Sequence, residues 1–136
     1  MFFKHLIHFI FTVLAFITLD LLWLGFVAKQ FYRSRLHVLL SDEVNWFAAG
    51  VFYIIYTLGM IWFVVLPATK HASWSAAILN GALLGGICYA TYDLTNHATL
   101  KNWPPIVSIV DILWGIFITS VTCVFSYAIS TKFILD

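Results

Sequence analysis

The chain has 136 residues, of which 62% are hydrophobic and only 10% carry a charge. Soluble domains have about 25% charged residues, so this composition excludes an ordinary soluble protein. The formal net charge is +1, which gives no basic surface for a nucleic-acid partner. We therefore expect a single transmembrane domain over residues 1–136.

Apolar runs of about 20 residues predict transmembrane helices. Such runs occur at residues 6–28, 46–66, 74–96 and 105–130. The first run is too long for a signal peptide and contains Asp20, so we read it as a membrane span. Pro67 is expected to end the second helix, and Pro105 suits the first turn of the fourth. Short connections between the runs predict an all-α membrane protein, an antiparallel four-transmembrane-helix bundle.

The first predicted helix carries Asp20 and Trp23, which share a face because they are three residues apart. The connection after it begins Lys29-Gln-Phe-Tyr-Arg33, a basic segment with interleaved aromatic residues that could engage lipid phosphates. Basic residues are divided almost evenly between the two ends of the predicted bundle. The positive-inside rule therefore does not resolve the orientation.

Small and polar residues form a stripe along each of the last two predicted helices, at spacings of three and four. On the third helix, Gly81 and Gly85 form a GxxxG step that permits close helix approach, and Tyr89, Asp93 and His97 continue the stripe. On the fourth helix the stripe comprises Ser108, Asp111, Gly115, Thr119, Thr122 and Ser126. These stripes predict the faces through which the helices pack.

Three aspartates, Asp20, Asp93 and Asp111, lie within the predicted spans. A carboxylate in lipid costs about 2.5–3.5 kcal/mol and usually faces a protein interior or a water-filled cavity. Counting along antiparallel helices places all three at the same end of the bundle. Two carboxylates that approach closely there would titrate as a coupled pair. The expected ligand-binding or proton-relay site comprises Asp20, Trp23, Tyr92, Asp93, Asn96, His97, Asp111 and Trp114.

Aromatic side chains supply hydrogen-bond donors at this end. The spacing of Asp111 and Trp114 repeats that of Asp20 and Trp23. We therefore expect indole N–H and phenol O–H groups to donate hydrogen bonds to the buried carboxylates. Trp103 is expected in an interfacial aromatic belt instead.

Histidine and cysteine residues receive separate predictions. His8 is expected at the interface of the opposite end, whereas His97 lies beside the aspartates. Carboxylates with an imidazole could hold a divalent cation, although no cofactor is evident and no HExxH motif occurs. The candidate metal ligands are Asp20, Asp93, His97 and Asp111. Cys88 and Cys123 are expected to be free and away from the site, because their predicted depths differ by roughly 15 Å.

Three segments carry a resemblance to a known family: Tyr92-Asp93-Leu-Thr-Asn96-His97 followed by Trp103-Pro104, Asp111-Ile-Leu-Trp114-Gly115, and Asp20-Leu-Leu-Trp23-Leu-Gly25. They resemble a family of small bacterial inner-membrane proteins, the domain-of-unknown-function family 2177. The resemblance covers essentially the whole chain. It implies a four-helix, multi-pass protein of the inner (plasma) membrane of bacteria. It implies no established activity, so it assigns no catalytic residue.

Three functions fit these observations. The first is a small proton-coupled transporter or ligand-binding protein, in which carboxylates exchange protons for a cation or a polar substrate. Four helices are few for a closed pathway, so this hypothesis needs a homo-oligomer. The second is a membrane enzyme acting on a lipid, with Asp20, Asp93 or Asp111 and His97 as acid-base residues. The third is a non-catalytic assembly subunit of a membrane complex. Expected partners are membrane lipid and a small-molecule, cation or lipid ligand.

Overall fold

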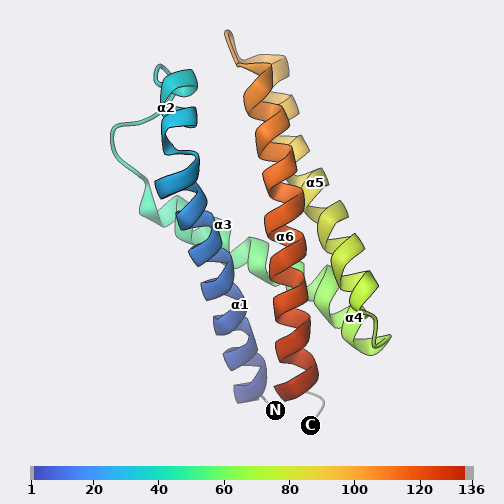
Figure 1. Cartoon of the computed structure of the whole chain (residues 1–136). Helices are drawn as coiled ribbons and strands as arrows, with labels where there is room; N and C mark the ends of the chain where they lie inside the picture. The colour runs from blue at the N-terminus through green and yellow to red at the C-terminus, as the bar shows by residue number, and fades with distance from the viewer. Residues whose placement is uncertain (1, 134–136) are drawn as a thin grey trace.

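A computed structural model describes residues 2–133 and contains only helices within that range (Figure 1). In chain order the elements are α1 (Phe2–Leu22), η1 (Trp23–Val27), α2 (Lys29–Leu36), α3 (Trp46–Met60), η2 (Ile61–Val65), α4 (Leu66–Lys70), α5 (Trp74–Thr99) and α6 (Pro105–Phe133). Both η1 and η2 are π-helical segments that continue directly from an α-helix.

Four continuous helical stretches are long and apolar enough to cross a membrane, as the sequence predicted. They are Phe3–Val27, Trp46–Lys70, Trp74–Thr99 and Pro105–Lys132. Large apolar side chains cover their outer surfaces, where Phe47 is 82% and Leu79 is 67% exposed. Such an exterior suits lipid, because helices satisfy their own backbone polar groups and leave apolar side chains outside.

Pro67 does not end the second span, contrary to the sequence-based expectation. The helix continues through α4 to Lys70. The proline follows η2, in which the backbone N–H of Leu66 bonds to the carbonyl of Ile61. A π-helical turn widens the helix locally, so the proline ring is accommodated without breaking the span.

Three of the helices begin at residues whose type favours a helix start. Asn45 caps α3 by accepting a hydrogen bond from the Ala48 backbone N–H at 3.0 Å. Ser73 caps α5 in the same way through Ala76, at 3.1 Å. Pro105 is the first residue of α6, where a missing N–H has no helical partner to lose.

The closest helix contact joins α5 and α6 and depends on glycine. A Cβ atom at Gly85 would lie 2.1 Å from the carbonyl oxygen of Gly115, and one at Gly115 would lie 2.2 Å from the ring of Tyr89. A Cβ atom at Gly81 would lie 3.0 Å from the Ser120 Cα, a tight contact that a small shift could relieve. Only a glycine fits at Gly85 and Gly115, so Gly85 sets the separation of the two helices and Gly115 fixes the Tyr89 ring against α6.

Figure 1 shows the arrangement of the spans. Adjacent helices α1 and α6 run in opposite directions, as do α5 and α6, whereas the stretch from α3 to α4 crosses behind them obliquely. A core of Phe16, Met60, Val64, Val65 and Ile118 lies between them. α2 and the α5–α6 connection lie at the same end of the molecule, and the site described below is built at that end.

Candidate functional site: an aspartate pocket

Asp20 lies near the end of α1 and is only 6% exposed. Its two carboxylate oxygens accept hydrogen bonds from different helices. Tyr53 of α3 donates to Oδ2 at 2.7 Å, and the Trp114 indole of α6 donates to Oδ1 at 3.2 Å. Asp20 therefore joins three spans through one buried carboxylate.

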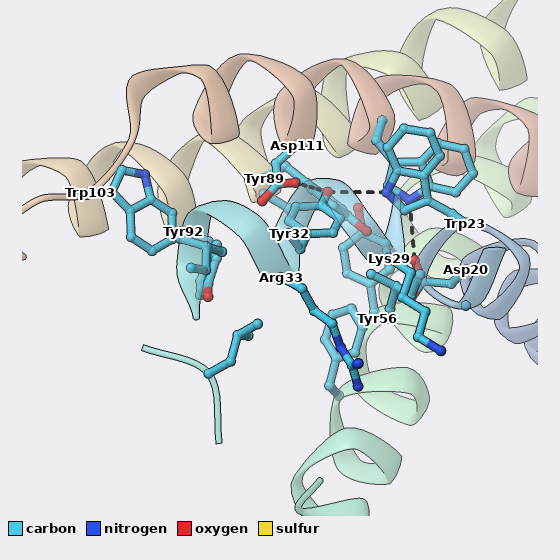
Figure 2. Close-up of a pocket in the computed structure, with 17 residues that line it drawn as sticks. Asp20, Trp23, Lys29, Tyr32, Arg33, Tyr56, Tyr89, Tyr92, Trp103 and Asp111 are labelled. Carbon is cyan, nitrogen blue, oxygen red and sulfur yellow. Dashed lines mark hydrogen bonds between the residues drawn. The ribbon is translucent and has the colours of Figure 1, made fainter. Parts of the chain in front are cut away.

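Asp111 of α6 is bonded through a chain of aromatic donors. The hydroxyl of Tyr32 in α2 donates to Asp111 Oδ1, and the indole N–H of Trp23 donates to the Tyr32 oxygen at 3.2 Å. Figure 2 shows Asp111, Tyr32 and Trp23 joined in this order by dashed lines. The prediction that indole and phenol groups serve the carboxylates is confirmed, with each tryptophan acting on the aspartate of the other helix.

The two tryptophans also stack on each other. The rings of Trp23 and Trp114 are 4.4 Å apart and inclined by 7°. Trp23 begins the π-helical segment η1, in which its carbonyl accepts the N–H of Ala28 at 2.8 Å. A π-helical turn changes the direction of the side chains that follow, and such turns are frequent at functional sites.

A cavity of about 790 Å³ opens beside these groups and is called the aspartate pocket here. Its polar or aromatic lining residues are Asp20, Trp23, Lys29, Tyr32, Arg33, Phe52, Tyr56, Cys88, Tyr89, Tyr92, Trp103, Asp111 and Trp114. The remaining lining residues are Leu24, Gly25, Leu36 and Leu40. Such a volume suits an organic ligand, since pockets for small molecules measure about 300–1,000 Å³ and are mostly apolar.

Two cationic side chains of α2 lie beside the pocket. Lys29 and Arg33 both line it, and in Figure 2 their nitrogens point away from Asp111. Between residues 2 and 133, no ion pair joins either cation to an acidic side chain. The carboxylates and the cations are therefore separately available to a ligand.

Tyr32 lies outside the apolar spans and keeps its phenolic proton. Burial raises its pKa above the ordinary value for tyrosine, and the hydrogen bond to Asp111 raises this pKa further. Tyr32 is therefore a hydrogen-bond donor over the whole physiological pH range.

Asp93 is fully buried and does not line the pocket. Within the described residues no N–H or O–H group donates to either of its carboxylate oxygens, but the carboxyl group of Asp111 acts on Asp93 both by charge and by a side-chain hydrogen bond. Its backbone carbonyl accepts from Ser108 at 3.4 Å. The structure thus places two of the three aspartates on the pocket wall and the third behind it.

Of the remaining predicted site residues, one lines the pocket and two do not. Tyr92 lines the pocket, whereas Asn96 and His97 are absent from its lining, and His97 is exposed. In the part of the chain that is described, no group of three His, Cys, Asp or Glu residues is arranged to hold a metal ion. Binding of a divalent cation by Asp20, Asp93, His97 and Asp111 stays a prediction that this geometry does not support.

Three sequence-based expectations outside this set were wrong. Cys88 is free, as predicted, but it lines the pocket. Trp103 is 7% exposed and donates to Ser108 at 3.0 Å, so it is not a belt residue. His8 is 2% exposed rather than interfacial, because Ser126 of α6 offers it a buried partner.

Six residues at the site were not among those predicted from the sequence: Lys29, Tyr32 and Arg33 of α2, and Tyr53, Tyr56 and Tyr89 of the spans. The signal for the first three was present in the basic, aromatic segment after the first span. The signal for the tyrosines was their spacing of three within α3 and α5, which predicts a shared face but no partner.

The model of one protein family, described as a predicted membrane protein (DUF2177), matches residues 5–128. The chain belongs to this family. No curated protein and no solved structure matches the chain.

Membership agrees with the four apolar helices, and the protein is a multi-pass integral membrane protein. The matched residues include every residue that lines the aspartate pocket. The pocket therefore lies within the part of the chain that the family model matches.

Proposed function

We propose that the protein binds an amphiphilic organic cation in the aspartate pocket, as the ligand-binding step of a small transporter. The observation that carries this proposal is the pairing of Asp20 and Asp111 with stacked and edge-on aromatic rings inside one largely apolar cavity. Carboxylates attract a cation by charge, and aromatic faces add a cation–π attraction of about 0.5–2 kcal/mol each. The apolar walls accommodate the rest of the ligand.

Lys29 and Arg33 limit the form of the ligand. Because they point away from Asp111, a cation beside the carboxylates need not approach them closely. They would instead attract an anionic group at the mouth of the pocket, such as the phosphate of a zwitterionic amphiphile. The proposal places the cationic group of the ligand deep in the pocket and any anionic group at α2.

The test compares two ions of the same shape and opposite charge. Binding of tetraphenylphosphonium and tetraphenylborate to the purified full chain is measured by equilibrium dialysis in a nonionic detergent. We expect saturable binding of the phosphonium only, weakened at least about tenfold, or 1.4 kcal/mol, in Asp20→Asn and in Asp111→Asn. Asp42→Asn, in the exposed connection, is the matched control and should bind like the wild type.

Other outcomes would overturn the proposal. Binding of the borate but not the phosphonium, lost in Arg33→Gln, would make the pocket an anion site. Unchanged phosphonium binding in both aspartate variants would remove the carboxylates from the site altogether.

One observation favours a second candidate, a membrane enzyme acting on a lipid. The free thiol of Cys88 lines the same pocket as Asp20 and Asp111, so a thiol that can act as a nucleophile shares one cavity with two acid-base groups. The protein is incubated in phospholipid vesicles, and the lipids are then analysed by mass spectrometry. A new lipid product that disappears in Cys88→Ala would favour the enzyme, and no product would favour the binding protein.

A further inference from the structure

A second polar cluster is buried in the opposite half of the membrane domain. His8 Nε2 of α1 lies 2.8 Å from Ser126 Oγ and 3.0 Å from the Ser126 carbonyl oxygen of α6. Thr12 Oγ1 lies 2.8 Å from the same Ser126 hydroxyl and donates to the His8 carbonyl at 2.8 Å. All three side chains are at most 2% exposed. A buried histidine in a membrane span is costly, so it suggests a function beyond helix packing.

This cluster continues to the membrane surface. Ser130, one turn beyond Ser126 on α6, is fully buried and accepts a hydrogen bond from Thr69 of α4 at 3.3 Å. Thr69 is 9% exposed and is followed by Lys70 and His71, which are exposed. The polar groups therefore reach the end of the domain that lies opposite the aspartate pocket.

The same face of α6 also leads back to the pocket. Tyr56, which lines the pocket, shares a 2.8 Å hydrogen bond with Thr119 Oγ1. One turn further, Thr122 Oγ1 is completely buried and has no hydrogen-bond partner among the described residues. A buried hydroxyl without a partner is rare and points to a bound molecule such as water.

The spacing fits a continuous path. Residues three and four apart on a helix have side chains about 5–6 Å apart, which is the distance that one bridging water molecule spans with two hydrogen bonds. Thr119, Thr122, Ser126 and Ser130 follow this spacing and are called the hydroxyl file here. At 1.5 Å per residue the file extends over about 16 Å of α6.

We propose that the hydroxyl file, with His8 and Thr12, conducts protons between the aspartate pocket and the opposite membrane surface. Each hydroxyl or water accepts a proton on one side and donates its own proton on the other, so no covalent product forms. His8 lies beside the file and meets Ser126 through Nε2, so it accepts a proton from the file and returns it to Ser126. The titratable groups are Asp20 and Asp111 at the pocket, and His5, which acts on His8 by charge from the same helix.

Conduction goes beyond the proposed cation binding, and it can be measured with no ligand present. The full chain is reconstituted in liposomes that contain a pH-sensitive dye. Proton entry is then driven by a potassium diffusion potential set with valinomycin. We expect entry to be faster than in protein-free liposomes, and to fall at least about tenfold in Ser126→Ala and in Thr122→Val, because each substitution interrupts the file.

The variants are chosen so that folding does not decide the result. Thr122→Val keeps the side-chain shape and removes a hydroxyl that has no partner among the described residues, so it should fold like the wild type. Ser120→Ala is the control for Ser126→Ala, because Ser120 bonds to the Ile78 carbonyl of α5, away from the file. Thr131→Val is the corresponding control for Thr122→Val, since Thr131 bonds within its own helix.

Two results would overturn the inference. One is wild-type proton entry equal to that of protein-free liposomes. The other is unchanged entry in Thr122→Val and Ser126→Ala, which would make the buried hydroxyls packing groups only. Because phosphonium binding is measured separately, a wild-type protein that binds the phosphonium but conducts no protons would overturn this inference and leave the proposed function standing.

Discussion

The Tyr32 hydroxyl donates a hydrogen bond to the carboxylate of Asp111, which lies 79 positions later in the chain. This bond ties α2, a short polar helix outside the apolar spans, to the buried face of α6. It also brings Lys29 and Arg33 to the pocket, because all three residues belong to the same two turns of α2. The position of α2 therefore depends on a pairing that local sequence cannot show.

Removal of this hydroxyl should loosen α2. In Tyr32→Phe, Asp111 loses its phenolic donor and the Trp23 indole loses its acceptor. An unpartnered buried polar group costs about 1–3 kcal/mol, so amide hydrogen exchange over residues 29–36 should accelerate while α5 is unaffected. Tyr92→Phe is the control, because Tyr92 makes no hydrogen bond to α2 in the described structure. Equal exchange in the two variants would contradict a holding role for Tyr32.

A methyl group added at Gly115, where α5 and α6 are in contact, should destabilise the protein. In Gly115→Ala the new Cβ would meet the Tyr89 ring at 2.2 Å, so the ring or the helix must move. We expect a loss of about 1–3 kcal/mol in the free energy of unfolding and weaker phosphonium binding, since Tyr89 lines the pocket. Unfolding in detergent with urea measures the first effect. Gly59→Ala, where nothing lies within 4 Å, should be neutral or stabilising.

Replacement of Asp93 by asparagine, its neutral isostere, should stabilise the protein. Its carboxylate is fully buried, no N–H or O–H group among residues 2–133 donates to it, and it lies within interaction range of the Asp111 carboxylate, so its negative charge destabilises the fold. Asp93→Asn should therefore raise the free energy of unfolding by about 1 kcal/mol or more, with Asp42→Asn as the exposed control. A decrease in stability would mean that the carboxylate has a stabilising partner.

The sequence predicted the four spans well because hydropathy depends only on each local run of residues. It also predicted that Asp20, Asp93 and Asp111 gather at one end, since counting along helices fixes depth. Depth does not fix orientation about the helix axis in detail, which is why Asp93 turned out to lie behind the pocket and His97 outside it.

Other parts of the site required the packed structure. The π-helical segment that begins at Trp23 leaves no mark in the hydrophobic periodicity, yet it alters the direction of the side chains that follow it. The oblique course of α3 brings Tyr53 to Asp20, which an ideal bundle does not predict. His8 looked interfacial because it lies near the chain start, and only the facing Ser126 shows why it can be buried.

The most direct test of the central claim asks whether a bound cation protects Cys88 from alkylation. Cys88 lines the pocket, whereas Cys123 is buried in the core and serves as an internal control. Alkylation by a small maleimide is followed at both thiols by mass spectrometry, with and without tetraphenylphosphonium. The account predicts that Cys88 reacts, that the phosphonium slows its reaction, and that protection is lost in Asp20→Asn. Equal protection by tetraphenylborate, or phosphonium protection that survives in Asp20→Asn and Asp111→Asn, would contradict a carboxylate-based cation site.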